Sequence, residues 1–313
     1  MKMSQVNGRS TKGMSDRYGH IIVDGSNLAR RSFHKHRGLS IEHRGRTVRT
    51  GVTFGFLKSL IKLKRLFRGE LLITWDQGYD VRKKLYPQYK EKRRVNKDEA
   101  EMTDYYDQLE TLSKVLAAIG VSQYRCKGWE ADDLMHTLSV MHTSSGRGRA
   151  IIASNDHDMY QCLTESIHQF VDLKGRTRVW TPKVFEDEYE LPPSRYLDVL
   201  SLSGDSGDGV PGIKGVGELT AMRAIRACPT LVHDIIASNQ LNPSGALTAS
   251  LIAKLDRDTV VLTRQLVMLY TVRKLQVISP PQNRKLMMRC LEILELDSFT
   301  EEHQWNSLCQ LGM

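Results

Sequence analysis

Residues 20–24 read HIIVD, a short and continuous apolar run that ends in the carboxylate of Asp24. Two later stretches repeat this design: residues 71–75 (LLITW) precede Asp76, and residues 150–154 (AIIAS) precede Asp156 and Asp158. Apolar runs of this length are typical of strands that are buried on both faces of a sheet. Because sites in parallel sheets form at the carboxyl ends of the strands, we expect these acids to converge on one place.

Helical periodicity fills the sequence between these runs. Apolar residues recur at helical spacing in two sets, Val52, Phe56, Leu60 and Leu63, and then Leu109, Leu112, Val115, Leu116 and Ile119. Strands that alternate with helices predict an α/β domain with a mainly parallel sheet. The pattern becomes helical after Pro182, and Tyr196 opens a new apolar helix.

Composition narrows the class of protein. The chain has 313 residues, of which 40% are hydrophobic, enough for one large domain or for a main domain with a smaller one. No apolar run approaches the roughly 18 residues of a membrane span, and the polar residues 1–17 contain no signal-peptide segment. The five cysteines lie far apart without CxxC spacing, which argues against zinc or disulfide frameworks and favours a reducing, cytoplasmic setting. The net charge of +9 favours a nucleic-acid partner, although charge alone fits simple solubility equally well.

Proline breaks and charge divide the chain into predicted segments. We expect a loose tail over 1–19, the α/β domain over 20–193, a helical region over 194–280 and a helical tail over 281–313. Residues 80–105 are crowded with Lys and Arg and hold too few apolar side chains for a core element, so they predict a projecting segment.

Nine carboxylates stand in short acidic motifs at predicted strand ends, at a helix start and in a glycine-rich turn. They are Asp24, Asp76, Glu130, Asp132, Asp133, Asp156, Asp158, Asp205 and Asp208. Taken singly, each acid is more typical of a helix cap or a turn. Taken together, buried like charges repel and need cations, and oxygen-only ligands favour Mg²⁺ or Mn²⁺. Two such ions about 4 Å apart suit phosphodiester hydrolysis, which needs no protein nucleophile.

The glycine-rich stretch 204–217 predicts a hairpin that leads into a helix at Glu218. Glycines allow close approach of the backbone to a phosphate, and the helix start offers free N–H groups. Such a helix-hairpin-helix element grips the backbone of a duplex without reading its sequence. The candidate contacts are Gly212, Lys214, Gly215 and Gly217. A plain glycine-rich turn is the alternative interpretation.

These motifs, in this order, resemble the flap endonuclease family of 5′-nucleases over about residues 20–275. The similarity is greatest to the compact bacteriophage enzymes and to the 5′-nuclease domain of bacterial DNA polymerase I. The matching pieces are VDGSN (23–27), WD (75–76), EADD (130–133), SNDHD (154–158) and GDSGD (204–208). The resemblance implies a PIN-like α/β domain with a helix–three-turn–helix DNA-binding region. Family members commonly have Asn where this chain has Gly209, which puts local hydrogen bonding in doubt but not the metal ligands.

The resemblance also implies residue roles. Asp24, Asp76, Glu130, Asp132 and Asp133 match positions around one metal ion, and Asp156, Asp158, Asp205 and Asp208 match those around a second. A K⁺ ion is implied between residues 212–217 and a DNA phosphate. Residues 80–105 match a helical arch that a single strand threads, with Lys90 and Arg93 as catalytic cations near the scissile phosphate and Tyr89 placed to stack on a base. Arg31 matches a phosphate contact.

The implied activity is 5′→3′ exonuclease and flap endonuclease action on DNA, and on RNA primers in hybrids, by a monomer in replication or repair. The sequence names no replisome partner. A Toprim-type domain is a weaker alternative because its first strand usually carries Glu where this chain has Asp24, and a haloacid-dehalogenase phosphatase would need Asp where Ser26 stands. The rival from another class is a non-catalytic DNA-junction clamp.

Overall fold

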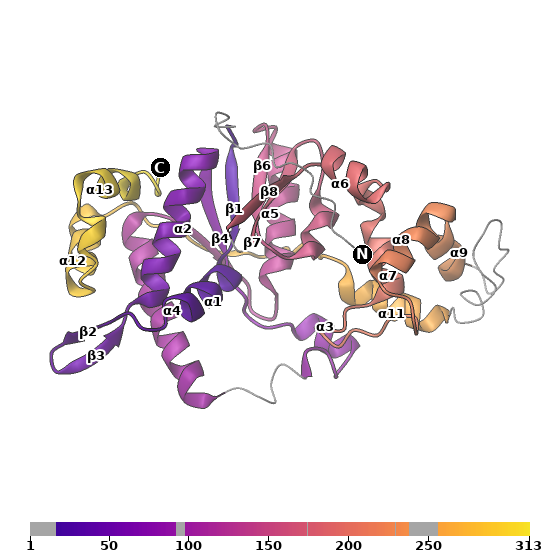
Figure 1. Cartoon of the computed structure of the whole chain (residues 1–313), viewed down its shortest axis with the longest axis horizontal. Coiled ribbons are helices and arrows are strands. Elements are labelled where there is room, and N and C mark those ends of the chain that lie inside the picture. The colour runs from indigo at the N-terminus through magenta and orange to yellow at the C-terminus, as the bar shows by residue number, and fades with distance from the viewer. Residues whose placement is uncertain (1–16, 92–97, 174, 229, 238–255) are drawn as a thin grey trace.

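A central sheet dominates the structure, a computed structural model that describes residues 17–91, 98–173, 175–228, 230–237 and 256–313 (Figure 1). The strands are β1 (His20–Asp24), β2 (Ser40–His43), β3 (Arg46–Arg49), β4 (Glu70–Thr74), β5 (Ser122–Arg125), β6 (Ala150–Ala153), β7 (Ile167–Leu173), β8 (Arg176–Trp180) and β9 (Gln276–Ile278). The order in the main sheet is β8-β7-β6-β1-β4-β5-β9, while β2 and β3 form a separate hairpin. Strands β7, β6, β1, β4 and β5 run parallel, and β8 and β9 are antiparallel edges. The predicted α/β fold class is confirmed.

Helices occupy most of the remaining described chain. They are α1 (Gly25–Lys35), α2 (Gly51–Phe67), α3 (Asp80–Leu85), α4 (Glu99–Ile119), α5 (Ala131–Ser145), α6 (Pro182–Tyr189), α7 (Tyr196–Ser203), α8 (Glu218–Ala227), α9 (Leu231–Ala237), α11 (Arg257–Val267), α12 (Arg284–Ile293) and α13 (Glu302–Cys309). Short 3₁₀ turns are η2 (His157–Cys162), η3 (Pro193–Arg195) and η4 (Asp297–Phe299). None of the described helices is long and apolar enough to cross a membrane.

The strands are apolar along their whole length because helical segments pack on both faces of the sheet. Because side chains alternate along a strand, Ile21 and Val23 of β1 enter the core shared with α1, α2 and α4. Ile22 points the other way, into the core shared with α5 and η2. All three side chains are at most 1% exposed. This three-layer arrangement places the carboxyl ends of β1, β4 and β6 beside one another at one edge.

A second, mainly helical part packs around its own core, on the right of Figure 1. Helices α7, α8, α9 and α11 contact one another, and the aromatic side chains of Tyr160, Trp180, Phe185 and Tyr196 join their apolar residues in one cluster. The helix expected from Tyr196 and the helix expected from Glu218 both begin at those residues. Of the region expected to be helical, residues 238–255 lie outside the described ranges.

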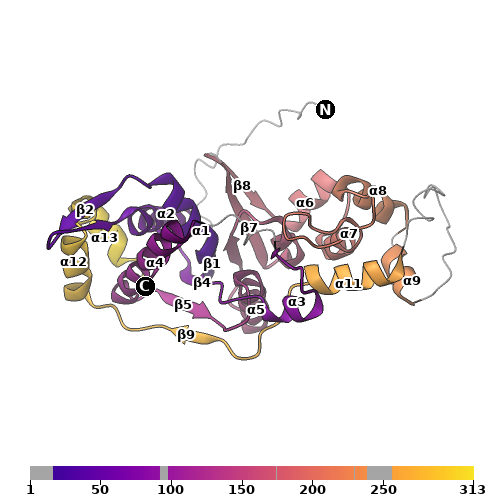
Figure 2. The same ribbon diagram turned by 90° about the horizontal axis from the view of Figure 1, so that it is seen from below.

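The chain then returns to the first part, which the segment boundaries of the sequence did not anticipate. Strand β9 pairs antiparallel with β5, so residues 276–278 belong to the sheet although they fall in the segment expected to be helical (Figure 2). Beyond the proline break, α12 and α13 pack on the first part through Met287, Leu291 and Leu308, which are buried in its main core. The expected packed terminal helix is therefore present as α12, followed by α13.

Two glycines of the hairpin between α7 and α8 should differ in how strongly their substitution affects stability. A Cβ added at Gly212 would lie 2.0 Å from the carbonyl oxygen of Ser203, whereas nothing lies within 4 Å of one added at Gly217. We expect Gly212→Ala to lower the unfolding free energy by about 2–4 kcal/mol because backbone must move, and Gly217→Ala to lower it by less than about 1 kcal/mol. Urea unfolding followed by circular dichroism measures both. Equal effects would contradict the tight packing at Gly212.

Candidate active site

Asp24 is held in place by the start of the helix that follows it. As the N-cap of α1, its Oδ1 accepts from the backbone N–H of Asn27 at 2.9 Å, and its Oδ2 accepts from the hydroxyl of Ser154 at 3.1 Å. The residue is 6% exposed. Asp24 can therefore serve both as a helix cap and as a residue of the candidate site, because the cap fixes the direction in which its carboxylate points.

Asp76 links the end of β4 to the EADD motif. Its backbone N–H donates to the Ser26 hydroxyl at 2.8 Å, and its Oδ1 accepts from the backbone N–H of Ala131 at 2.7 Å. Ala131 is the first residue of α5, and Glu130 is the N-cap residue of that helix. Asp76 thus fixes the position of the motif relative to two strand ends.

The SNDHD motif turns sharply after β6. Asp156 caps η2, because its Oδ1 accepts from the backbone N–H of Asp158 at 2.9 Å. The Ser154 hydroxyl lies 3.1 Å from the backbone nitrogen of Asp156 and also contacts Asp24, so β1 and β6 share a hydrogen-bonded corner.

The glycine turn brings its two acids from the helical part. Asp205 Oδ1 accepts from the backbone N–H groups of Gly207 and Asp208 at 2.7 and 3.3 Å. Gly209 has a φ of +72°, a left-handed backbone that glycine adopts without strain. The departure from the family pattern at Gly209 therefore fits the geometry of this turn.

Five of the predicted acids line one pocket, whereas Asp24 lines a second pocket and Asp76 and Asp156 line neither. The charged lining of the first pocket consists of Arg82, Glu130, Asp132, Asp158, Asp205 and Asp208. Burial raises the pKa of Asp132 and of Asp158 well above its usual value, and neighbouring carboxylates raise it further in both cases. Burial and then the charge of Asp76 raise the pKa of Asp24 to about 7. The acids are therefore close enough to repel one another.

A divalent metal fits this donor set by chemistry. The lining offers carboxylate oxygens without a cysteine or histidine, the ligand set of hard ions such as Mg²⁺ and Mn²⁺. Among the described residues, no group of three His, Cys, Asp or Glu side chains forms a ready-made metal site. Binding would therefore draw the carboxylates together, which their mutual repulsion opposes until a cation compensates it.

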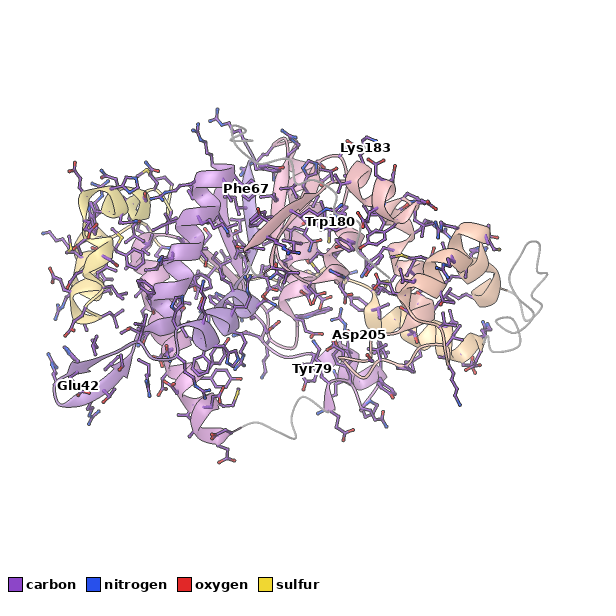
Figure 3. The ribbon with its side chains drawn as sticks, in the orientation of Figure 1. Glu42, Phe67, Tyr79, Trp180, Lys183 and Asp205 are labelled. Atoms are coloured by element: carbon purple, nitrogen blue, oxygen red, sulfur yellow. The ribbon has the colours of Figure 1, made fainter. Side chains whose placement is uncertain are left out.

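The base of the expected arch lies in this pocket. The Lys90 ammonium pairs with Glu130 and, at 3.2 Å, with Asp208, while the Lys90 backbone N–H donates to the Asp208 carbonyl oxygen at 2.8 Å. Burial acts to lower the pKa of Lys90, but Glu130 and Asp208 outweigh it and raise that pKa. Figure 3 labels Tyr79 and Asp205 in this part of the molecule. Arg93, the other expected cation, lies outside the described residues.

Tyr89 differs from the expectation that it stacks on a base. The residue is 4% exposed, and its ring lies in the helical core, where it meets the Tyr79 ring edge-to-face with 5.5 Å between the ring centroids. Its hydroxyl donates to Glu130 at 3.0 Å, with Asp208 at 3.3 Å. The physical reason is that the ring packs in the same hydrophobic cluster as Val210 and Val267, which leaves its hydroxyl among the acids.

Arg31 and Asp24 both line a second pocket, which lies between α1, α2 and the ends of β6 and β7. Arg31 donates to the carbonyl oxygen of Asp172 at 2.8 Å, and Lys62 pairs with the Asp172 carboxylate at 2.6 Å. Lys62 and Asn155 line this pocket together with Arg31 and escaped the sequence analysis. Helical spacing on α2 places Lys62 on the same side as Ser59, but nothing in the sequence pairs α2 with β7.

The hairpin between α7 and α8 has the expected shape. The Ile213 N–H donates to the Leu202 carbonyl oxygen, and the Val216 N–H donates to the Ile213 carbonyl oxygen, both at 2.9 Å. Gly215 has a φ of +80°. Lys214 and Gly217 are exposed, and α8 starts immediately after Gly217.

Comparison with known proteins gives this architecture a family. Residues 19–190 match the N-terminal resolvase-like domain of 5′-3′ exonucleases, and residues 191–284 match the C-terminal SAM fold of 5′-3′ exonucleases. The chain belongs to the 5′-3′ exonuclease family.

Several named relatives of this 5′-3′ exonuclease family member are DNA polymerases. The thermostable DNA polymerase I of Thermus thermophilus is 31% identical over 258 residues, which cover 82% of this chain and 29% of the polymerase. The DNA polymerase I of Mycobacterium bovis is 29% identical over 59% of this chain and 20% of the polymerase. A 5′-3′ exonuclease of Buchnera aphidicola is 28% identical over 59% of this chain and 62% of its own length. The chain thus spans only a fifth to a third of the length of these polymerases.

Solved structures show the same fold. The 5′-exonuclease of T5, solved with divalent zinc ions, matches with a TM-score of 0.64 and 19% identity over 94% of this chain and 99% of its own. The catalytic core of Rad2 in complex with a DNA substrate matches with a TM-score of 0.55 and 16% identity over 90% and 93% of the two chains. At these identities the likeness concerns the fold alone.

The raised pKa of Asp24 predicts how the stability of this protein depends on pH. Because the pKa rises from 3.8 to about 7 on folding, the folded state holds this proton more tightly, and stability is lost as pH rises through that window. Asp24→Asn keeps the helix cap and removes the charge. Without divalent metal, we therefore expect the stability of the variant minus that of the parent to be larger at pH 8 than at pH 5. Thermal melts in EDTA measure the difference. A relative loss at pH 8 would contradict the assignment.

Proposed function

We propose that this protein is a structure-specific 5′-nuclease that hydrolyses phosphodiester bonds of DNA with two divalent metal ions. The observation that carries the proposal is the pocket in which acids from η2, from the start of α5 and from the glycine turn meet the basic arch segment. A polyanionic substrate can approach acids only if cations outweigh them, and metal ions with basic side chains supply those charges. Membership of the 5′-3′ exonuclease family supports the same activity.

The acids fall into two groups by position. Asp24, Asp76, Glu130 and Asp132 would hold one ion at the strand ends and the α5 start. Asp156, Asp158, Asp205 and Asp208 would hold the other between η2 and the glycine turn, where Asp156, Asp205 and Asp208 add to the raised pKa of Asp158. The resemblance put Asp133 in the first group, but its contacts in the structure differ and are treated below. When bound, Mg²⁺ or Mn²⁺ would activate water and stabilise charge on the phosphate.

The hairpin and the arch segment would hold the nucleic acid. Exposed Lys214, the glycines Gly212, Gly215 and Gly217, and the start of α8 offer a duplex phosphate both charge and N–H groups, and a K⁺ ion there would be held by backbone carbonyl oxygens. Arg31 would contact a phosphate beside Asp24. Lys90 would act near the scissile phosphate, together with Arg93. The protein would act as a monomer, and on RNA–DNA hybrids as well as on DNA.

The direct test is cleavage of a 5′-labelled flap compared with an unbranched duplex, each with Mg²⁺ or EDTA. We expect flap release that depends on Mg²⁺ and is much faster than nicking of the duplex. Tight binding without product in Mg²⁺ or Mn²⁺ would replace the nuclease with a non-catalytic clamp.

Removing one acid of the second group should strongly slow DNA cleavage and leave DNA binding unchanged. We expect Asp156→Asn to lower the single-turnover cleavage rate by about 10²–10⁴-fold, because a misplaced ion loses its stabilisation of the reacting oxygens. The matched control is Asp187→Asn, an exposed acid on α6 that pairs only with Lys183 among the described contacts. Quench-flow cleavage and fluorescence anisotropy separate rate from affinity. An unchanged rate would remove Asp156 from the site.

The hairpin lysine should act through the phosphate backbone. We expect Lys214→Ala to weaken duplex binding for all sequences alike and to reduce the slope of log affinity against log salt by about 1. Lys183→Ala, an 82% exposed lysine on α6, is the control and should leave the slope unchanged. Anisotropy titrations at four salt concentrations provide the slopes. Identical slopes for the parent and Lys214→Ala would exclude this contact.

A further inference from the structure

Asp133 has contacts unlike those of the neighbouring acids. Its Oδ2 accepts from Arg82 Nη1 at 2.6 Å, and its Oδ1 accepts from Arg82 Nη2 at 2.9 Å and from the backbone N–H of Tyr270 at 2.9 Å. The residue is 0% exposed. Asp132, which precedes it, is half-buried and lines the carboxylate pocket, whose described lining does not include Asp133. Adjacent residues on a helix point about 100° apart, so the two acids serve different surroundings.

Arg82 joins three segments at this point. Besides Asp133, its Nη1 donates to Glu130 Oε2 at 2.9 Å. Its Nε donates to the carbonyl oxygen of Leu266 at 2.8 Å, and its Nη2 donates to that of Met268 at 2.9 Å. The guanidinium therefore connects α3, the start of α5 and the end of α11. It is 4% exposed.

We propose that Asp133 is not a metal ligand but one half of a buried clamp with Arg82, which positions the α5 start and hence Glu130 and Asp132 for metal binding. Arg82 is in this sense a positioning residue. The inference rests on the proposed two-metal function and changes the ligand set within it.

The energetics favour the clamp. The fork of Arg82 matches both oxygens of Asp133, a bidentate and charge-assisted geometry. If Asp133 turned to a metal ion, Arg82 would remain buried with only part of its donors satisfied, and breaking a buried pair is strongly unfavourable. The Tyr270 N–H would also lose its acceptor. Asp132 can turn toward an ion without these losses.

The test is a double-mutant cycle on metal binding and melting temperature, with the full chain. The variants are Arg82→Gln, Asp133→Asn, the double variant and Asp132→Asn, titrated with Mn²⁺ while electron paramagnetic resonance follows the free ion. The clamp predicts that Arg82→Gln and Asp133→Asn each weaken Mn²⁺ binding by about 10–100-fold, without loss of a bound ion at saturation. The double variant should be no weaker than either single one, because both changes remove the same interaction.

Melting temperatures add an independent readout. In EDTA each single change should lower the melting temperature by about 5–15 °C, since it breaks the buried bidentate pair of Arg82 and Asp133. The double variant should recover part of that loss. Asp132→Asn should hold or raise the melting temperature in EDTA and lose a bound Mn²⁺. Arg82→Lys should recover part of the Mn²⁺ affinity lost in Arg82→Gln, which a general loss of structure would not allow.

Other results would overturn the clamp. If Asp133 were a ligand, Asp133→Asn would lose an ion and Arg82→Gln would leave Mn²⁺ affinity unchanged or higher, because the carboxylate would be freed. If the single variants do not fold, Arg82→Met with Asp133→Leu removes both charges together: the parent number of ions supports the clamp, and one fewer overturns it. Absence of Mn²⁺ binding by the parent itself would instead overturn the two-metal function.

Discussion

Repulsion between like charges at one edge of the sheet is the constraint on which the rest of this structure depends. Parallel strands β1, β4 and β6 end side by side; β1 ends in Asp24, and an acid follows each of the other two strands. Burial and neighbouring carboxylates raise the pKa of Asp24, Asp132 and Asp158, which measures the cost of placing them together. The structure offsets this cost locally, because Asp24, Asp76 and Asp156 each accept a backbone N–H at the start of a helical turn. Helix starts are therefore aimed at the acids.

The chain also brings its own cations to these acids, and both come from the segment around α3. Arg82 pairs with Asp133 and Glu130, and Lys90 pairs with Glu130 and Asp208. Glu130 thus pairs with two cations, which act to lower its pKa. Burial is the larger influence, so the pKa of Glu130 is still raised. The same two cations connect the arch base to the start of α5, to the end of α11 and to the glycine turn. The site is consequently assembled from segments that lie far apart in the sequence.

The sequence allowed prediction of those features that local pattern determines. The run of residues 20–24 predicts β1 because apolar continuity reports burial on both faces, and Glu218 begins α8 because the glycine hairpin ends there. It did not allow prediction of β9, since an exposed three-residue edge strand carries little apolar signal and depends on β5 for its hydrogen bonds. The sequence also did not allow prediction of the direction in which a side chain points. Asp132 and Asp133 are alike in sequence, and they are distinguished by contacts with distant residues, above all with Arg82, which lies 51 residues from Asp133.

The position of Lys90 couples the arch segment to the acids in both directions. Its ammonium shares Glu130 and Asp208 with any cation that those carboxylates hold, and the Tyr89 hydroxyl shares the same two acceptors. A metal ion on these carboxylates would therefore compete with Lys90. A ligand that draws Lys90 away would strengthen metal binding, and by thermodynamic reciprocity the metal would strengthen binding of that ligand by the same factor. A phosphate is one such ligand, because it offers the ammonium another anionic partner. In the proposed function, binding of nucleic acid at the arch and binding of metal at the acids would thus be linked through one side chain.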